Sequence, residues 1–299
     1  MLSTSKNIVI GASGLIGGAL YDQFKKNSQE VIGTHTHHPR MQDLIKFDME
    51  GDDFADLCEF VGAGDNVYIM SAYSSPSWIY KNREAAEKLN LTGTIRLIEA
   101  LRLKNPRIIF MSSVEVFDGV KGKYMEFDQP NPLNYYGVLK FEIEKYLKNN
   151  FAKSTIIRTG WNVGLDVRSR CVVKLTYDSL LEPNARMAND NYFSISDVRD
   201  TAEVLRLLSG HPEVRELHIC ADEVINRAAL AKLIQQTSKN GHKMGYKECS
   251  FFDIEYSEPR GRVSDLDNSL SKAVLGASYR KALDIIADKV KFIDAQQQG

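Results

Sequence analysis

A tyrosine and a lysine stand four residues apart in the segment 135–149, which reads YYGVLKFEIEKYLKN. This segment is predicted to be a helix, so Tyr136 and Lys140 share one face with their Cβ atoms about 6 Å apart. Tyr135 is rotated by about 100° and points elsewhere. An ammonium group beside a phenol favours the phenolate, and Lys140 is expected to lower the pKa of Tyr136 from about 10. The pair therefore predicts a group that gives or takes a proton near neutral pH.

A glycine-rich turn near the N-terminus is suited to holding a phosphate group. The sequence GASGLIG places three glycines directly after the apolar run 7–12 and at the start of a helical pattern over 15–26. The first permits a tight turn, the second lets the backbone approach a pyrophosphate, and the third allows close helix–strand packing. The helix N-terminus adds unpaired N–H groups and a positive dipole. The motif predicts a dinucleotide loop, with contacts from Gly11, Ser13, Gly14, Leu15, Ile16 and Gly17.

The end of the second predicted strand (30–34) indicates which dinucleotide would bind. An NAD-preferring site usually has an acidic residue there, whereas GTHTHHPR has no carboxylate between Gly33 and Arg40. NADP(H) is therefore favoured over NAD(H), with a solvated loop as the alternative interpretation. Asp48, next to Met49, is expected to meet the adenine. No Cys/His cluster elsewhere accompanies the histidines, so no metal is expected. The residues that could donate to a 2′-phosphate are Thr34, His35, Thr36, His37 and Arg40.

The elements that must position these residues alternate between strands and helices. Apolar runs rich in β-branched residues predict strands, and apolar residues at helical spacing predict helices between them. Strands buried on both faces and connected by helices form a parallel sheet. The fold class is therefore α/β, a Rossmann-type doubly wound parallel sheet. The predicted strands are 7–12, 30–34, 66–72, 107–113 and 154–159, and the predicted helices are 15–26, 82–103 and 135–149.

The second half is expected to contain a smaller C-terminal substrate-binding portion. A strand-to-helix unit over 193–208, with Ser196 or Asp197 as N-cap, and a strand at 216–220 are expected to return to the Rossmann domain. The polar stretch EPNARMANDN (182–191) suits a loop or lid better than a strand. The chain is thus divided into an NAD(P)-binding domain (1–160, with 193–220) and a substrate-binding portion (161–192 and 221–299), with helices expected at 226–238 and 279–294.

The composition excludes several classes of protein. The 299 residues are 43% hydrophobic and 26% charged, which is typical of a globular chain with a sizeable core. The 38 Lys and Arg residues are balanced by 39 Asp and Glu residues, so no basic excess exists for nucleic acid. The apolar runs are far shorter than the ~20 residues of a membrane span. The first residues lack the apolar region of a signal peptide, so a cytoplasmic protein is expected.

Taken together, these motifs resemble those of extended short-chain dehydrogenases/reductases, and within them the dTDP-4-dehydrorhamnose reductase (RmlD-like) group. The resemblance extends over nearly the whole chain. It is carried by GASGLIG, SSVEVFDG (112–119), YYGVLK (135–140), IIRTGWNVG (156–164), FSISDVRDTA (193–202) and RVSDLDNS (262–269).

The resemblance implies a role for each matching residue. Ser113, rather than Ser112, matches the catalytic Ser/Thr that hydrogen-bonds the substrate oxygen. Tyr136 matches the general acid/base, and Lys140 matches the residue that binds the nicotinamide ribose and lowers the pKa of the tyrosine. The resemblance also implies cofactor contacts by Ser71, Ala72 and Asn90 and a substrate contact by Trp161. Structural alternatives are a strand-end cap for Ser113, a helix interruption for Asn90 and a core position for Trp161.

Two departures from the family pattern fall on the substrate side. The family carries Asp-Tyr after its catalytic residue, where this chain has Val114 and Glu115, which become the expected substrate contacts. The stretch before the third substrate loop is reduced to MANDNYFS (187–194). The cofactor and the proton chemistry are therefore implied more directly than the identity of the sugar.

The resemblance implies an NADPH-dependent reductase of a nucleotide-linked 4-keto sugar, which uses a Tyr-Lys-Ser proton relay. The sequence leaves the oligomeric state open, a homodimer being common among the proteins it resembles, and neither nucleic acid nor membrane is expected as a partner. One alternative is a sugar-nucleotide epimerase or dehydratase with a retained NAD. The other is a non-catalytic NADP-binding regulatory subunit.

Overall fold

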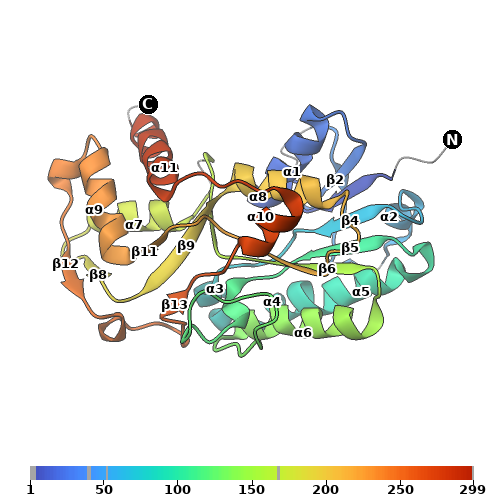
Figure 1. Cartoon of the computed structure of the whole chain (residues 1–299), viewed down its shortest axis with the longest axis horizontal. Helices are drawn as coiled ribbons and strands as arrows, with labels where there is room; N and C mark the ends of the chain where they lie inside the picture. The colour runs from blue at the N-terminus through green and yellow to red at the C-terminus, as the bar shows by residue number, and fades with distance from the viewer. Residues whose placement is uncertain (1–4, 39–41, 52, 167–168, 298–299) are drawn as a thin grey trace.

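A seven-stranded parallel sheet forms the larger half of the molecule (Figure 1). The computed structural model describes residues 5–38, 42–51, 53–166 and 169–297. The strands follow the order β10-β6-β5-β4-β1-β2-β3, and each neighbouring pair runs parallel. This topology confirms the predicted α/β doubly wound class. The strands are β1 (Asn7–Ile10), β2 (Val31–His35), β3 (Ile45–Lys46), β4 (Asn66–Ile69), β5 (Arg107–Met111), β6 (Ser154–Thr159) and β10 (Glu216–Ile219).

Alternate residues of the central strands face opposite sides of this sheet, and both sides are apolar. Val9 and Ile109 pack on one face with residues of α1 and α8. Ile8 and Ile108 pack on the other face with residues of α2, α5 and α6. Because both faces are covered, the strands read as continuous apolar runs in the sequence. The helices are α1 (Leu15–Lys26) and α8 (Val198–Leu208) on the first face, and α2 (Ala55–Glu59), α5 (Thr94–Ala100) and α6 (Tyr135–Asn150) on the second.

The long helix predicted over 82–103 is divided in the structure. It consists of α4 (Arg83–Glu87), a π-helical turn (Lys88–Gly93), α5 and a 3-10 turn (Arg102–Lys104), and a short helix, α3 (Pro76–Lys81), precedes it. The wider turn changes the side chains that face inward. It places Asn90 in the interior, where this residue is only 2% exposed.

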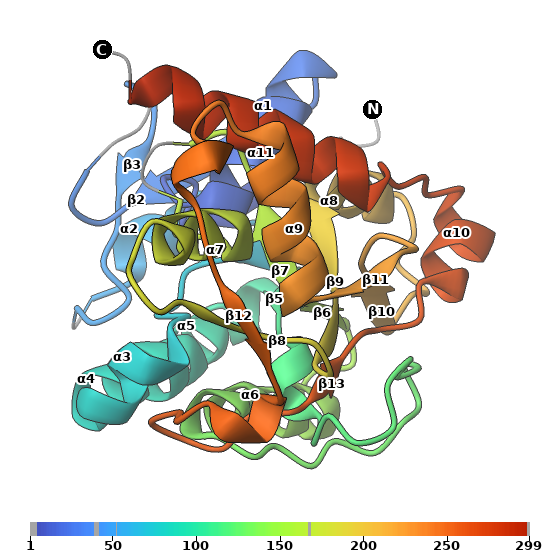
Figure 2. The same cartoon turned by 90° about the vertical axis from the view of Figure 1, so that its left-hand side faces the viewer.

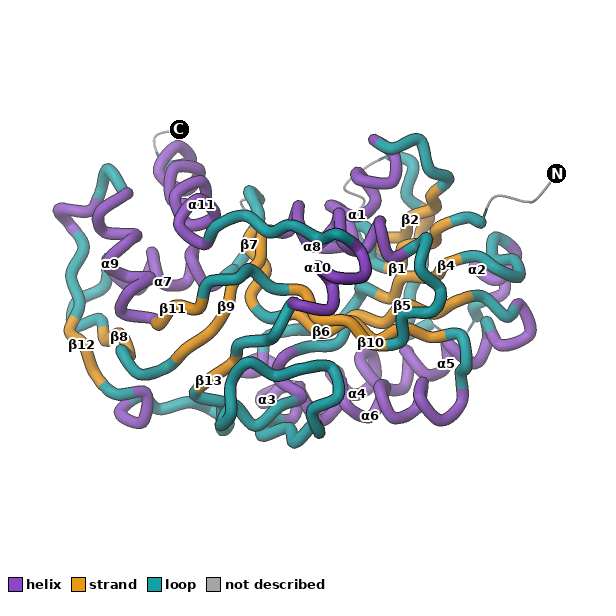
Figure 3. Tube along the Cα trace, viewed as in Figure 1, coloured by secondary structure: helices purple, strands orange, loops and turns teal. Residues whose placement is uncertain are grey.

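The smaller half contains a second sheet centred on β9 (Figure 2). This strand pairs antiparallel with β11 and parallel with β7 and β13. Phe193 and Ile195 of β9 share one apolar cluster with residues of α7, α9 and α11. Figure 3 shows the strands of the two sheets as separate groups connected by loops. The elements are β7 (Trp161–Val163), β9 (Tyr192–Asp197), β11 (Val224–Asn226), β13 (Val263–Ser264), α7 (Val172–Leu180), α9 (Arg227–Thr237) and α11 (Ala282–Gln296). Helix α10 (Ser269–Leu275), which lies between β13 and α11 in the sequence, packs instead with β10 and α8 of the larger half.

Two expectations for the second half are wrong. The stretch 182–191, expected as a loop or lid, contains β8 (Arg186–Ala188), which pairs with β12 (Lys247–Cys249). The partner strand lies far away in the sequence, so local composition gives no sign of it. The strand of the unit 193–208 joins the smaller sheet, whereas α8 and β10 pack with the large sheet. Asp197 is the N-cap of α8, and its side chain accepts a hydrogen bond from Arg199 N (2.8 Å).

The loop after the candidate catalytic serine crosses a late segment of the chain at very short distance. Gly119 has φ +66°, and a Cβ at this position would lie 2.2 Å from the Cα of Gly261. A Cβ on Gly261 would lie 2.8 Å from the Cα of Gly119. Val263 N donates to Gly119 O (2.9 Å) just beyond the crossing. Two glycines thus let the two backbones touch where the halves of the molecule meet.

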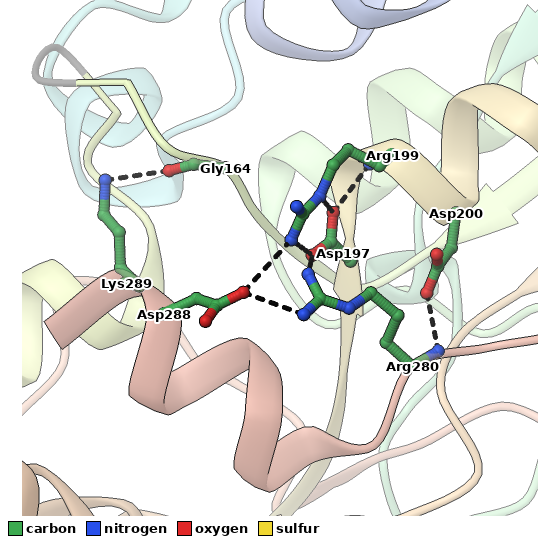
Figure 4. A network of polar contacts seen from close by, with 7 residues as sticks. All are labelled: Gly164, Asp197, Arg199, Asp200, Arg280, Asp288 and Lys289. Atoms are coloured by element: carbon green, nitrogen blue, oxygen red, sulfur yellow. Dashed lines mark hydrogen bonds and ion pairs between the residues drawn. The ribbon is translucent and has the colours of Figure 1, made fainter. Parts of the chain in front are cut away.

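A polar network connects α8 of the larger half to α11 of the smaller half (Figure 4). Arg280 donates through Nη1 to Asp197 (2.9 Å), through Nη2 to Asp288 (2.8 Å) and through its amide to Asp200 (2.7 Å). Nearby, Lys289 donates to Gly164 O (2.8 Å). The charges of this network therefore lie on both sides of the boundary. No helix within the described residues combines the length and the apolar character needed to cross a membrane.

Candidate active site

The glycine turn predicted from GASGLIG lies between β1 and α1. Gly11 has φ +86°, a left-handed conformation that favours glycine, and its carbonyl accepts a hydrogen bond from Gly14 N (3.0 Å). A Cβ on Gly17 would lie 2.3 Å from that same carbonyl oxygen, so the helix can start this close only with glycine there. The turn leaves the first N–H groups of α1 at the carboxyl edge of the sheet, where an anion is favoured.

A pocket of about 330 Å³ opens beside this turn. The residues that line it follow β1, β2 and β4, and β1 lies between the other two strands in the sheet. Parallel strands end at the same edge of a sheet, so the three segments meet there. The glycine cradle and the space beside it fit the phosphates and ribose of a dinucleotide. Of the pocket residues, His38 and Met70 were not singled out from the sequence, although each adjoins a predicted contact. The pocket is lined by Gly11, Ser13, Gly14, Thr36, His37, His38, Met70, Ser71 and Ala72.

The side chains at the end of β2 divide into two groups. Thr34 is only 1% exposed and its Oγ1 accepts from Gly11 N (3.0 Å), so it supports the glycine turn from the interior and is not open to a 2′-phosphate. Thr36 Oγ1 donates to Phe47 O (3.1 Å). Among the described residues, the buried Nδ1 of His35 has no hydrogen-bond partner. His37 lines the pocket with its neighbour in sequence, and the predicted donor Arg40 lies outside the described residues.

The residues expected near the adenine, and Asn90 among the other expected cofactor contacts, are fixed by local contacts. Asp48 is exposed and its Oδ1 accepts from Glu50 N (2.9 Å), whereas Met49 is buried in the apolar cluster below the sheet. Asn90 binds the backbone of Tyr73 twice, accepting from its N (2.9 Å) and donating to its O (2.8 Å). Its amide therefore fixes the loop that follows β4.

The three predicted catalytic side chains come together at the carboxyl end of β5. Ser113 lies just beyond this strand, and its side chain is close enough to Tyr136, the second residue of α6, to lower the pKa of that phenol. Lys140 Nζ donates to Met111 O (2.8 Å) and lies 5.8 Å from the centre of the Tyr136 ring. The spacing of four residues thus places both α6 side chains against β5. Asn134 caps this helix by accepting from Gly137 N (2.9 Å).

Burial controls the protonation of this group of side chains. Tyr136 is 8% exposed, and burial raises the pKa of its phenol, while the hydrogen bond with Ser113 lowers it. The expectation that Lys140 lowers the pKa of Tyr136 is therefore wrong in direction, because burial raises this pKa. Burial also lowers the pKa of Lys140 to about 7, so the amine itself is only partly charged at neutral pH. At this pH the phenol keeps its proton and is ready to donate it.

The residues expected on the substrate side surround the end of β5. Val114 is 5% exposed and packs in an apolar cluster with Phe117. The carboxylate of Glu115 accepts from Asn134 Nδ2 (2.5 Å) at the start of α6. Trp161, in β7, is partly buried and packs against the core of the smaller half. Of the two adjacent serines, Ser113 is the one beside Tyr136, while Ser112 donates to Glu144. Ser113 Oγ also accepts from Glu115 N (3.2 Å), the capping role that was the structural alternative.

A buried carboxylate beneath this site was not singled out from the sequence. Glu144 lies on α6 one turn beyond Lys140, has no exposed surface and accepts from Ser112 Oγ (2.5 Å). The available signal was the repeated spacing of four residues, which continues from Tyr136 through Lys140 to Glu144. Its position on the same helix face as Lys140 did not show that the carboxylate of Glu144 is buried.

The chain matches one family over nearly all of its length. The family described as "RmlD substrate binding domain" matches residues 5–291. Among solved structures, a hypothetical dTDP-4-dehydrorhamnose reductase from Sulfolobus tokodaii superposes with a TM-score of 0.77 at 25% identity, covering 94% of this chain and 98% of that one. A dTDP-4-dehydrorhamnose reductase from Bacillus anthracis in complex with NADP has the same fold, with a TM-score of 0.77 at 18% identity, covering 97% and 99%.

Two kinds of curated protein are similar to this chain over part of their length. The methionine adenosyltransferase 2 subunit beta of Bos taurus is 26% identical over 209 residues, which span 68% of this chain and 61% of that protein. The dTDP-4-dehydrorhamnose reductase of Aggregatibacter actinomycetemcomitans is 33% identical over 162 residues, which span 52% and 51%. This chain thus matches between half and about three fifths of the length of these relatives.

Proposed function

Because the chain belongs to the RmlD substrate-binding family, we propose that it is an NAD(P)-dependent oxidoreductase that reduces a keto group of a nucleotide-linked sugar. The observation that carries this proposal is the assembly of Ser113, Tyr136 and Lys140 at the sheet edge that also holds the glycine pocket. Neither the group of three side chains nor the glycine pocket is informative alone. Together they support a proton donor next to a bound dinucleotide, which is what a carbonyl reduction would require.

The dinucleotide would be held by the glycine turn and by the ends of β2 and β4. Gly11, Ser13 and Gly14 would contact its phosphates, and Ser71 and Ala72 would lie on the opposite wall. NADP(H) is preferred in this proposal, because the pocket has the imidazoles of His37 and His38 where an NAD site usually has a carboxylate. When bound, the cofactor supplies a hydride to the carbonyl carbon.

The protein's own contribution is a proton and a fixed orientation. Tyr136 would protonate the carbonyl oxygen, and its raised pKa keeps the phenol protonated until that oxygen gains electron density. Ser113 would donate a hydrogen bond to the same oxygen. Lys140 would bind the nicotinamide ribose through its ammonium group, as in the family that the sequence resembles. These three residues form the proposed Tyr-Lys-Ser relay.

The substrate proposed is a nucleotide-linked 4-keto sugar. One observation supports this class: the similar protein from A. actinomycetemcomitans is a dTDP-4-dehydrorhamnose reductase. Val114 and Glu115 are the residues that would distinguish this sugar from that of relatives with Asp-Tyr at the same place. Trp161 would contact the sugar from the smaller half.

Replacing Tyr136 tests this function. In Y136F, turnover of NADPH with 4-keto sugar nucleotides should fall by roughly 10²–10⁴-fold, because the proton donor is lost. The dissociation constant for NADP+ should stay within about twofold of wild type, because the phosphate and ribose contacts remain. Turnover is followed by NADPH absorbance and binding by calorimetry. Unchanged turnover in Y136F would remove the assigned acid, and product formation without net NADPH consumption would indicate an epimerase or dehydratase instead.

A non-catalytic NADP-binding regulatory subunit is the second candidate. The observation that favours it is the similarity to the methionine adenosyltransferase 2 subunit beta of Bos taurus. In this case wild type and Y136F would both bind NADP+, and neither would reduce any 4-keto sugar nucleotide. A stable complex with a partner enzyme, isolated together with NADP+ binding but without turnover, would support this alternative.

A further inference from the structure

Three consecutive turns of α6 face three consecutive residues at the end of β5. The side chain of Tyr136 contacts Ser113, Lys140 Nζ donates to Met111 O (2.8 Å), and the carboxylate of Glu144 accepts from Ser112 Oγ (2.5 Å). Glu144 is the innermost of the three helix residues and has no exposed surface. The proposed function uses the first two contacts and leaves the third unexplained.

The carboxylate of Glu144 is held in one position by a buried arginine. Arg158 Nε donates to Oε1 (2.9 Å) and Arg158 Nη2 donates to Oε2 (2.6 Å), while Oε1 also accepts from Ser112. Arg158 is itself fixed, because it also donates to Glu216 (2.8 Å) and Glu126 O (3.2 Å). A carboxylate with both oxygens bound in this way keeps its charge inside the protein. It is not free to turn and form an ion pair with Lys140.

Lys140 lies in surroundings that disfavour an ammonium group. It is 4% exposed and lies 4.7 Å from the centre of the Phe110 ring. Among the described residues, its Nζ has a carbonyl, Met111 O, within hydrogen-bond distance and no carboxylate within ion-pair distance. A buried amine of this kind tends to lose its proton unless a nearby negative charge opposes the loss.

We propose that Glu144 is a positioning residue that keeps Lys140 charged: held by Arg158 and Ser112, its carboxylate provides the negative charge that lets a buried ammonium group bind the dinucleotide. This inference rests on the proposed dinucleotide-binding function, in which Lys140 contacts the cofactor. It goes beyond that function by assigning the charge of this lysine to a residue that touches neither cofactor nor substrate.

The charged and titratable groups around Lys140 come from several elements. Tyr136 and Glu144 lie on α6 itself, and Glu115 lies on the turn after β5. Arg158 of β6 faces Glu144 from the sheet, with Glu216 and His218 of β10 behind it. Burial lowers the pKa of Lys140 to about 7, and the charge of Glu144 opposes this effect. At neutral pH the amine of Lys140 is therefore near the midpoint of its titration. The loss of a neighbouring charge changes its protonated fraction most at this point.

The test is the pH dependence of NADP+ binding by the full-length protein. Affinity should weaken as pH rises through the pKa of Lys140, because the ammonium form binds. In Glu144→Gln, which keeps the shape and removes the charge, the midpoint of this weakening should move down by roughly one pH unit. In Glu144→Asp, which keeps the charge and shortens the reach, the midpoint should stay near its wild-type value. Calorimetry between pH 5.5 and pH 9 provides the dissociation constants.

Two further variants separate a charge effect from general damage. Asp294→Asn removes a buried carboxylate in the smaller half and should leave the midpoint unchanged. If Glu144→Gln does not fold, Glu144→Gln combined with Arg158→Met removes both buried charges together, and the midpoint should still move down, by a smaller amount. A folded Glu144→Gln or double variant with the wild-type midpoint would overturn the inference. Wild type that binds no NADP+ would instead contradict the proposed function.

Discussion

At the scale of single residues, burial determines which groups near the candidate site carry a charge. His218, in β10, has no exposed surface. Its Nε2 lies 3.3 Å from Arg158 Nη1 and its Nδ1 lies 3.0 Å from Tyr124 O. Because the guanidinium can only donate, Nε2 accepts and Nδ1 carries the proton, so the imidazole is neutral. Burial, together with the charge of Arg158, lowers the pKa of His218 to about 3.

Replacing His218 should change how stability depends on pH. Between about pH 6.5 and pH 3 the unfolded chain binds a proton on this histidine and the folded protein does not, so acidification destabilises the fold by up to ~1.4 kcal/mol per pH unit. In H218Q the free energy of unfolding should fall less steeply between pH 6 and pH 4, by about one proton. Urea unfolding at several pH values measures this slope. H242Q, which removes an exposed imidazole, should keep the wild-type slope, and an unchanged slope in H218Q would show that the buried imidazole does not govern it.

The sequence predicted which residues lie at the candidate site better than it predicted their pKa values and hydrogen-bond partners. Helical spacing selected Tyr136 over Tyr135, and the structure places Tyr136 against Ser113 while Tyr135 donates to Glu87 (2.8 Å). The direction of the pKa shift of Tyr136 was wrong, because spacing shows which groups are neighbours and does not show how little water reaches them. Thr34 was likewise predicted from its type, and only the fold shows that this side chain is buried beneath the glycine turn, where it accepts from Gly11 N.

At the scale of elements, the approach of α6 to the turn after β5 depends on one helical glycine. A Cβ on Gly137 would lie 2.1 Å from the carbonyl oxygen of Glu115. That carbonyl belongs to the 3-10 turn Val114–Val116, which directly follows Ser113. Helix α6, which carries the proposed acid Tyr136, and the turn that directly follows Ser113 are therefore in backbone contact, with no room for a side chain at residue 137.

Gly137→Ala should separate these two elements, although alanine is the better helix former. We expect destabilisation by roughly 1–3 kcal/mol from overpacking, together with a loss of turnover, because Ser113 and Tyr136 would no longer meet. Gly245→Ala is the matched control, because a Cβ there has no neighbour within 4 Å. Thermal unfolding and NADPH oxidation are the measurements. Wild-type stability and activity in Gly137→Ala would show that the turn can move without consequence.

The two helices that carry the glycine turn and the tyrosine were predicted to within one residue, whereas interrupted or non-local elements were missed. Helix α1 has the predicted bounds, and α6 ends one residue later than predicted. The π-helical turn at Lys88–Gly93 escaped prediction because its apolar positions also fit an α-helix. Strand β8 escaped because its stability comes from pairing with β12, which no local pattern reveals.

At the scale of the whole molecule, ionised carboxylates at the boundary between the halves carry a desolvation cost. Burial raises the pKa of Asp197 and of Asp200 to about 6, although Arg280 lowers both through its side chain or its amide. The ordinary pKa of an aspartate is about 3.9. Between these values the folded protein binds protons that the unfolded chain does not bind. These two residues therefore favour the folded state as pH falls from 7 toward 4, in contrast to His218.

Asp200→Asn should stabilise the boundary at neutral pH. The amide oxygen can still accept from Arg280 N, and the cost of the partly buried charge is removed. Because Asp200 is only about half buried, we expect a gain of ~1 kcal/mol at pH 7.5, which should become smaller at pH 5 as the wild-type carboxyl takes up a proton. Urea unfolding at both pH values tests this, with the exposed Asp284→Asn as a control. Equal or lower stability of Asp200→Asn at pH 7.5 would contradict the expected cost.

The crossing of Gly119 and Gly261 has a consequence for synthesis on the ribosome. The glycine turn and Tyr136 leave the exit tunnel early, but the backbone against which residue 119 lies is made much later. A nascent chain stopped before residue 261 would therefore contain the phosphate cradle and the phenol while the loop beyond the serine lacked its final support. The loop beyond Ser113 thus gains its last backbone neighbour only after most of the chain has been translated.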